Sequence, residues 1–366
     1  MTIEQIVSEE DKMYRDLQIH LDNQALAYPA LKSGAEIRVL KHIFEPEEAK
    51  IALYLRYKFE NFDVIYERAK ESGISKEELE IVLETMIMKG AIGHRVKDGK
   101  DQYQCWGFAI GFYEGQVNQL TPEFLTDVRE MADDPVFGLG FVSAKPFQVR
   151  TIPIEKSVTS ENRISTYDEL ENLIMNIKGP IGVVECICRQ AKEIAGEPCK
   201  VTSRLETCMA FGDFAKIFLT RGRGREISKE EALEIYRKNQ EEGLVLNSSN
   251  AIDTEFICSC CGCCCGLLGA HQLMPDPSNF WINNFHAEID SDLCVGCQTC
   301  IERCQVGAIK FKKSKNLSLI NLKKCIGCGN CVAVCPEEAI KLVKVENEII
   351  PPQTIDDLYD EIKSNR

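Results

Sequence analysis

The sequence lacks the short motifs by which many enzymes bind nucleotides or single metal ions. Its 366 residues include only five histidines, and none belongs to a His-x-x-His or His-Glu-x-x-His pattern. It contains no glycine-rich fingerprint for the phosphates of NAD or ATP. No apolar run approaches the roughly 20 residues that a membrane span requires. We therefore expect neither a nucleotide-binding enzyme of the common kinds nor a membrane-spanning protein.

Positive charge is also scarce. The formal net charge is −14 at pH 7, so the chain is a poor candidate for binding nucleic acid or an anionic membrane. The first residues run directly into acidic ones, without the basic head and apolar core of a signal peptide. We expect a soluble, cytoplasmic protein.

Cysteine is the residue that the sequence has in excess. There are 19 cysteines, most of them at short spacings, in a chain long enough to build a hydrophobic core. Dense cysteines in a reducing compartment indicate metal sites rather than disulfides. The odd number also argues against a framework made only of disulfides.

The pattern of the whole chain predicts a multidomain α+β protein. The segments are an N-terminal lead-in (1–36), a winged-helix-like domain (37–106), a linker with one helix (107–147), a mixed α/β domain (148–246), an irregular cysteine-rich segment (247–285), a segment with two cysteine repeats (286–346) and an acidic tail (347–366). Within the mixed α/β domain, strands are predicted over 149–154 and 181–187, and helices over 167–177 and 229–242.

The domain over 37–106 has the pattern of a winged helix. Helices are predicted over 47–58, 62–72 and 76–89, followed by strands over 92–96 and 102–106. The third helix begins with a capping box of Ser75 and Glu78 and ends at Gly90.

Acidic residues on this third helix argue against DNA binding. In DNA-binding winged helices, it enters the major groove and presents basic or amide side chains. Its charged residues here are two lysines and the carboxylates Glu77, Glu78, Glu80 and Glu84. A phosphate-lined groove would repel these carboxylates. We expect the domain to dock a protein, or to form a dimer or larger complex.

Two repeats of four cysteines are the most specific motif. The first consists of Cys294, Cys297, Cys300 and Cys304, and the second of Cys325, Cys328, Cys331 and Cys335. A tight loop with a cysteine at every third position supplies three thiolates to one iron–sulfur cube, and the other repeat supplies the fourth. The predicted ligands are Cys294, Cys297, Cys300 and Cys335 for one [4Fe–4S] cluster, and Cys325, Cys328, Cys331 and Cys304 for the other. Zinc instead favours paired Cys-x2-Cys knuckles.

These repeats resemble the bacterial-type two-cluster ferredoxins. The resemblance rests on the cysteine spacing and on a short Ala-Ile strand after each fourth cysteine, at 308–311 and 339–342. It implies low-potential transfer of single electrons. Gln305 stands where these ferredoxins usually have a proline, which would remove an amide and stiffen the turn. We expect Gln305 to alter hydrogen bonding near a cluster without removing a ligand.

Ten further cysteines form two groups upstream of the repeats. The first group is Cys186, Cys188, Cys199 and Cys208, and the second is Cys258, Cys260, Cys261, Cys263, Cys264 and Cys265. On a strand, Cys186 and Cys188 would lie on the same face. The first group could hold a third [4Fe–4S] cluster, and the second could complete that site or hold a fourth. We expect one or two further iron–sulfur clusters here.

Two single residues near these motifs have simpler interpretations. Arg189, next to Cys188, either offsets the negative charge of a metal site or pairs with a surface acid. Cys105, alone in the predicted wing, is expected to be a buried packing residue, as lone cysteines usually are.

The order of these motifs resembles a group of 4Fe–4S dicluster-domain proteins of anaerobic microbes, over most of the chain. The resemblance implies an iron–sulfur redox role but supplies no substrate. We expect an electron-transfer subunit that relays single electrons to or from a partner flavin or metal oxidoreductase. One alternative is an iron–sulfur reductase with a substrate-binding cluster on the upstream cysteines. Another is a redox-sensing winged-helix regulator.

Overall fold

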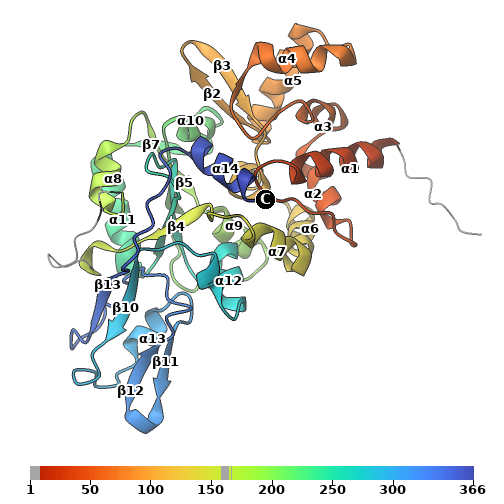
Figure 1. Cartoon of the computed structure of the whole chain (residues 1–366). Coiled ribbons are helices and arrows are strands. Elements are labelled where there is room, and N and C mark those ends of the chain that lie inside the picture. The colour runs from red at the N-terminus through yellow and green to blue at the C-terminus, as the bar shows by residue number, and fades with distance from the viewer. Residues whose placement is uncertain (1–8, 158–164, 166) are drawn as a thin grey trace, which may run out of the picture. The chain divides into compact units, whose positions relative to one another are not determined.

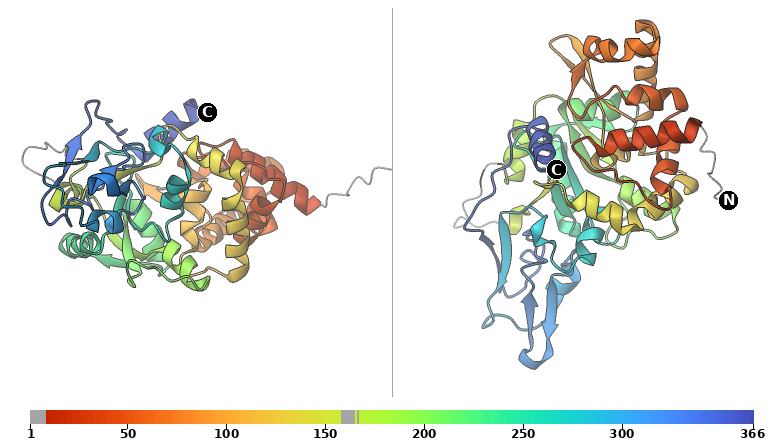
Figure 2. Two further views of the ribbon diagram at one scale, coloured as in Figure 1. Left: turned by 90° about the horizontal axis from the view of Figure 1, so that it is seen from below. Right: turned by 45° about the vertical axis from the view of Figure 1, so that its right-hand side comes forward.

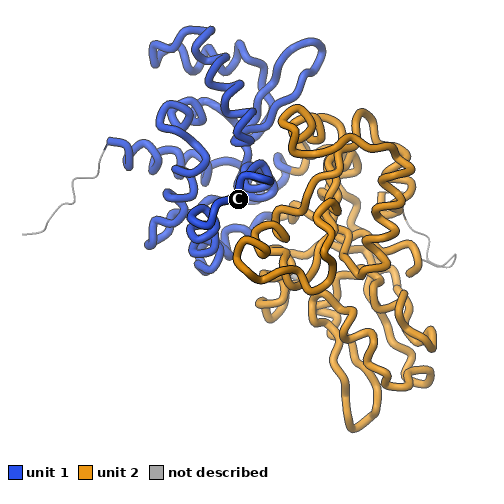
Figure 3. Tube along the Cα trace, turned by 180° about the vertical axis from the view of Figure 1, so that it is seen from behind, with its two compact units in different colours: residues 1–144, 359–366 blue, residues 145–358 orange. Residues whose placement is uncertain are grey.

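The computed structural model describes residues 9–157, 165 and 167–366, and it consists of two compact units (Figure 3). One unit contains the chain up to residue 144 and also residues 359–366, and the other contains residues 145–358. The acidic tail therefore contributes to both units. In the described ranges, no helix has the length and apolar composition needed to cross a membrane.

The N-terminal unit is mainly helical, with one small antiparallel sheet (Figure 1). Its helices are α1 (Glu9–Asp22), α2 (Ala35–Ile43), α3 (Pro46–Ala52), α4 (Phe62–Ala69), α5 (Lys76–Lys89), α6 (Pro122–Asp133) and α7 (Pro135–Val142). Its strands are β1 (Glu60–Asn61), β2 (Gly93–Lys97) and β3 (Lys100–Gln104), in the order β1-β3-β2. Helix α1 occupies much of the predicted lead-in and buries Leu17 and Leu21. The last helix, α14 (Ile355–Ser364), ends in this unit, where the hydroxyl of Tyr57 donates to Asp360.

Helix α5 begins and ends where the sequence predicts. The Ser75 hydroxyl accepts a hydrogen bond from the Glu78 amide, the Glu78 carboxylate accepts one from the Ser75 amide, and Gly90 ends the helix with a φ of 78°. The helix predicted over 62–72 is α4 followed by a 3-10 turn, and the two strands of the hairpin lie within two residues of their predicted positions. The winged-helix assignment itself stays a prediction.

The predicted linker over 107–147 contains a second helix besides the expected one. Thr121 caps α6 by accepting a hydrogen bond from the Phe124 amide. Helix α7 follows at once, because Asp134 accepts a hydrogen bond from the Val136 amide and Pro135 takes the first helical position. Because each cap starts a helix, this part of the predicted linker contains two consecutive helices, α6 and α7, where the sequence predicts one.

The C-terminal unit is built on a six-stranded antiparallel sheet. Its strands are β4 (Val149–Ile152), β5 (Ile181–Glu185), β6 (Glu206–Phe211), β7 (Arg225–Ile227), β8 (Val245–Ser249) and β9 (Phe256–Cys260), in the order β4-β8-β9-β6-β5-β7. Its helices before the repeats are α8 (Leu170–Asn176), α9 (Ile187–Ile194), α10 (Gly212–Thr220), α11 (Lys229–Glu242) and α12 (Gly266–Leu273). The described part of the chain is thus mixed α and β, as predicted.

The two faces of this sheet carry different residues. On one face, α8 and α11 cover a hydrophobic core that includes Met209 of β6, Ile257 of β9 and Tyr236 of α11. Side chains alternate along a strand, so Cys208 and Cys258 point to the opposite face. The register pairs Met209 with Ile257, which places Cys208 beside Cys258 on the neighbouring strand. Strand periodicity therefore collects cysteines on one face.

The prediction of irregular structure over 247–285 is wrong. This segment contains β9, most of β8 and helix α12. Cysteine is a small apolar residue as well as a metal ligand. The alternation of Phe256, Cys258 and Cys260 with Ile257 and Ser259 is therefore the period of a strand in a buried sheet. The period becomes visible in the sequence when each cysteine is counted as an apolar residue as well as a ligand.

The placement of Cys186 and Cys188 on one face of a strand is also wrong. Strand β5 ends at Glu185, and Cys186 is the N-cap residue of α9. The Cys186 carbonyl accepts hydrogen bonds from the amides of Arg189 and Gln190, which starts the helix. Cys188 therefore lies in the first turn of a helix.

The two repeats lie on two small antiparallel sheets (Figures 1 and 2). Strand β10 (Phe285–Ile289) pairs with β13 (Ile340–Lys344), β11 (Ile309–Lys312) pairs with β12 (Leu317–Ile320), and α13 (Thr299–Arg303) lies in the first repeat. The predicted Ala-Ile strands correspond to β11 and β13. Their residues Ile309, Ile340 and Leu342 pack in one core with Cys300 and Cys331.

Candidate metal centres

Four cysteines drawn from both repeats surround one hollow. The cysteines that line this hollow are Cys294, Cys297, Cys300 and Cys335. Cys300 is buried, whereas Cys297 is exposed, so the group reaches the protein surface at one ligand position. The structure thus brings together the four residues that the spacing predicts for one cluster. Their binding of iron stays a prediction.

The other four repeat cysteines form a second, more buried group. Cys331 interacts electrostatically with Cys328, Cys325 and Cys304, and also with Cys300 of the first group. Burial raises the pKa of the Cys328 thiol to about 12, and the neighbouring thiolates of Cys304 and Cys325 act in the same direction. Ligation therefore has to displace protons from these thiols. This is the set predicted for the other cluster, and it adjoins the first.

Backbone amides donate to sulfur in the same way in both repeats. The Ala308 amide lies 3.3 Å from the Sγ atom of Cys304, and the Ala339 amide lies 3.3 Å from the Sγ atom of Cys335. In each case the donor is four residues after the last cysteine of the repeat. Hydrogen bonds to cluster thiolates stabilise their negative charge and are one of the means by which a protein sets reduction potential.

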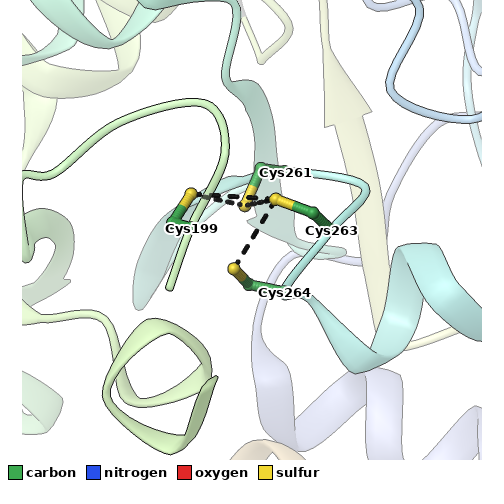
Figure 4. Close-up of side chains that lie close together, drawn as sticks. All are labelled: Cys199, Cys261, Cys263 and Cys264. Atoms are coloured by element: carbon green, nitrogen blue, oxygen red, sulfur yellow. Dashed lines mark hydrogen bonds between the residues drawn. The ribbon is translucent and has the colours of Figure 1, made fainter. Parts of the chain in front are cut away.

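Four of the upstream cysteines lie in direct contact (Figure 4). The Sγ atom of Cys199 lies 3.6 Å from that of Cys261 and 3.8 Å from that of Cys263. The Sγ atom of Cys263 lies 3.6 Å from that of Cys261 and 3.7 Å from that of Cys264. All four Sγ atoms lie within 4.8 Å of one another. Cys199 follows α9, and the other three lie between β9 and α12, so folding joins two distant loops.

The other six upstream cysteines form a closed ring of neighbouring thiols. The order of hydrogen-bonded neighbours round the ring is Cys186, Cys188, Cys265, Cys260, Cys258, Cys208 and back to Cys186. Cys208, Cys258 and Cys260 come from β6 and β9, and Cys265 is the N-cap residue of α12. Sheet and helix ends thus place six soft sulfur ligands in one region, in which Cys186, Cys260 and Cys265 are buried and the other three are partly buried.

The structure therefore sorts the ten upstream cysteines differently from their order in the sequence. The expected first group is divided: Cys199 joins the loop cysteines, whereas Cys186, Cys188 and Cys208 join the ring. The reason is that β6 and β9 are adjacent in the sheet, although about fifty residues separate Cys208 from Cys258. Cys105 is buried, and burial raises its pKa to about 12, in agreement with the predicted packing role.

Arg189 lies between the two groups of upstream thiols. Its side chain is only 2% exposed and donates hydrogen bonds to the Thr207 hydroxyl and the Ser259 carbonyl. Burial lowers the pKa of Arg189, but thiolates nearby, first that of Cys186, outweigh this effect and raise it. Within the described residues, no carboxylate forms an ion pair with this guanidinium. The alternative of an ion pair with a surface acid is therefore wrong. Glu242 interacts with Arg189 electrostatically without pairing, and the groups that raise the pKa of Arg189 are the thiols of Cys186, Cys208, Cys261 and Cys199.

Gln305 connects the repeats with the upstream cysteines. Its side-chain oxygen accepts a hydrogen bond of 2.9 Å from the amide of Gly262, which lies between Cys261 and Cys263. Its carbonyl accepts another, of 2.7 Å, from the side chain of Gln272. The departure from proline at this position predicted altered hydrogen bonding near a cluster. Nothing in the sequence pointed to Gln272 or Gly262 as its partners.

Comparison with protein families assigns the C-terminal part of the chain. Two family models, both described as a 4Fe-4S dicluster domain, match residues 286–336 and 324–358. No curated protein and no solved structure shows significant similarity to the chain. The C-terminal segment therefore carries 4Fe–4S dicluster domains, and together with the many other cysteines it indicates an iron–sulfur redox function.

Proposed function

We propose that the chain is an electron-transfer protein that relays single electrons through two [4Fe–4S] clusters to or from a partner oxidoreductase. The observation that carries this proposal is the arrangement of the eight repeat cysteines in two adjoining groups. One group reaches solvent at Cys297, whereas the other contains the buried Cys331 and no exposed cysteine. When bound, such clusters supply reversible one-electron chemistry, and the protein sets their potentials.

The exposed group offers a surface for a redox partner. Beside Cys297, the side chains of Leu293 and Val295 are 51% and 56% exposed. A small apolar surface next to an exposed ligand suits a transient contact, because it brings a partner's centre close without burying a large area. We place the docking site of the flavin or metal oxidoreductase here.

The second group of repeat cysteines is linked by hydrogen bonds to the upstream part of the same unit. Gln305 directly follows the predicted ligand Cys304 and is hydrogen-bonded to Gly262, in the loop of upstream cysteines. Arg303 donates to the carbonyls of Gln240 and Glu241 at the end of α11, which anchors the first repeat on the large sheet domain. Rigid attachment supports electron transfer, because it keeps the separation between centres constant.

Metal analysis of anaerobically purified protein tests this proposal. We expect at least about eight irons and a matching amount of acid-labile sulfide per chain, with EPR signals of two interacting reduced clusters. Cys325→Ser should abolish one of these signals, while Cys105→Ser, the control at a buried packing cysteine, should leave both. Zinc in place of iron, or no coupling between the two reduced signals, would contradict the relay.

A reductase is the second candidate, and the ring of six thiols favours it. A cube uses four thiolates, so the ring provides ligands for a further cluster besides the two of the relay. In a reductase, this region would hold a cluster that binds substrate at an open iron. Reduced protein that is reoxidised only by another protein supports the relay, whereas reoxidation by a small molecule with turnover supports the reductase.

Helix α5 is a further candidate for protein contacts. Its four glutamates, Glu77, Glu78, Glu80 and Glu84, are exposed. The side chains of Ile81 and Met88 on the same helix are 63% and 51% exposed. We propose that this helix docks a protein or a second copy of the chain rather than DNA, since its carboxylates would face phosphates.

A further inference from the structure

The cysteines of Figure 4 are spaced more closely than an iron–sulfur cube allows. Their neighbouring Sγ atoms lie 3.6–3.8 Å apart. Four thiolates at the corners of a tetrahedron around one ion, with bonds of about 2.3 Å, lie about 3.8 Å from one another. Thiolates of a cube lie roughly 6 Å apart, since each binds a different iron. The spacing therefore fits one ion.

The repeat cysteines provide an internal comparison. Cys294, Cys297, Cys300 and Cys335 line the wall of a hollow, and their ligand atoms do not all lie within 4.8 Å of one another. Among the described residues, the group of Cys199, Cys261, Cys263 and Cys264 is the one set of metal-ligating side chains whose ligand atoms all lie within 4.8 Å. The same chain thus contains two kinds of four-cysteine group, one whose thiols line a hollow and one whose thiols lie in direct contact.

The surroundings of the closed group stabilise thiolate sulfur. The Val201 amide donates to the Sγ atom of Cys199 over 3.4 Å. Arg189 forms a hydrogen bond with Cys199 and interacts electrostatically with Cys261. Four thiolates around a divalent ion carry a net charge of −2, which the buried guanidinium partly offsets. Donors and a cation next to the ligands are typical of the second shell of a metal site.

We propose that Cys199, Cys261, Cys263 and Cys264 bind one divalent transition-metal ion, Zn²⁺ or Fe²⁺, in tetrahedral geometry. All-sulfur tetrahedral sites select these soft or borderline metals. As four metal–sulfur bonds form, each thiol that is still protonated releases its proton to solvent, and no electron is transferred. The site is separate from the ring of six thiols and does not depend on the relay proposed above.

Variants of the full chain test the stoichiometry. We expect Cys199→Ser to lose about one metal ion per chain, measured by elemental analysis, with unchanged acid-labile sulfide. Cys105→Ser is the control, and both its metal content and its acid-labile sulfide should equal those of the wild type. Loss of zinc identifies Zn²⁺, whereas loss of one iron together with a high-spin ferric EPR signal of the oxidised wild type identifies Fe²⁺.

A measurement on the wild type covers the case in which the variant does not fold. If the ion is zinc, its X-ray absorption fine structure should show four sulfur neighbours at about 2.3 Å and no iron neighbour. If it is iron, Mössbauer spectra should contain a component from a single FeS4 site. Loss of about four irons and four sulfides in Cys199→Ser would assign a cube and overturn the proposal. Unchanged metal content in that variant, or the absence of both wild-type signatures, would also overturn it.

Discussion

Gly327 tests whether one repeat depends on the close approach of its cysteine loop to strand β10. Its φ is 65°, and a Cβ atom at this position would lie 2.2 Å from the carbonyl oxygen of Phe285. Alanine would cost about 1–2 kcal/mol for the left-handed backbone. The overlap with a main-chain atom would add about 1–3 kcal/mol. We expect Gly327→Ala to cost about 2–5 kcal/mol in total and to displace Cys325 and Cys328.

Gly307 is a matched control for this substitution. It has the same φ of 65°, but a Cβ atom there would meet no atom within 4 Å. Gly307→Ala therefore incurs only the backbone cost of about 1–2 kcal/mol. The difference between the two variants isolates the steric contact with Phe285.

Iron content and denaturation of the two variants decide the outcome. After anaerobic purification, Gly307→Ala should retain both clusters, and Gly327→Ala should lose about four of roughly eight repeat-bound irons together with one reduced EPR signal. Gly327→Ala should also unfold at a lower denaturant concentration than Gly307→Ala. Equal iron content and equal denaturation midpoints would refute the reasoning.

Three further perturbations follow from single contacts. Burial lowers the pKa of His20 to about 4. The unfolded chain therefore takes up this proton near pH 6.5 and the folded chain does not, so lowering the pH from 7 to 5 should cost about 1–2 kcal/mol of stability. Denaturation curves of His20→Gln should show a smaller loss of stability between pH 7 and pH 5 than those of the wild type. An equal loss in the variant would contradict this reasoning. Gln305→Ala removes the hydrogen bond that the Gly262 amide donates, which is worth about 1 kcal/mol. Hydrogen exchange at the Gly262 amide should therefore accelerate roughly fivefold. An unchanged exchange rate would show that this bond is not formed. Arg189→Met should destabilise the metal-loaded protein by about 3–5 kcal/mol, because it leaves buried thiolates without a compensating positive charge. Thr207→Val removes a hydrogen-bond partner of Arg189 but keeps its charge, so denaturation should show a much smaller effect. Equal effects of the two variants would argue that the charge of Arg189 is not what stabilises the protein.

Features that depend on neighbouring residues could be predicted from the sequence. The capping box and terminal glycine of α5 act within one helical turn, and the structure forms both as expected. The caps of α6 and α7 are equally local, but Asp134 both ends α6 and begins α7, so the second helix has no separating loop to mark it in the sequence. The repeat cysteines belong to the same class, since a loop of fixed spacing presents its thiols together, and the family models match this part of the chain.

The upstream cysteines mark what the sequence alone could not decide. Their number and short spacings indicated metal binding, because ten thiols so close in the sequence are typical of metal sites. Which thiols meet depends on the strand order, which places β6 beside β9 and divides the cysteines into a ring of six and a closed group of four. The bond between Gln305 and Gly262 and the burial of Arg189 also arise from contacts between segments far apart in the chain. Local spacing therefore determined the chemistry of the ligands, whereas long-range packing determined their partners, since only folding brings distant loops within bonding distance.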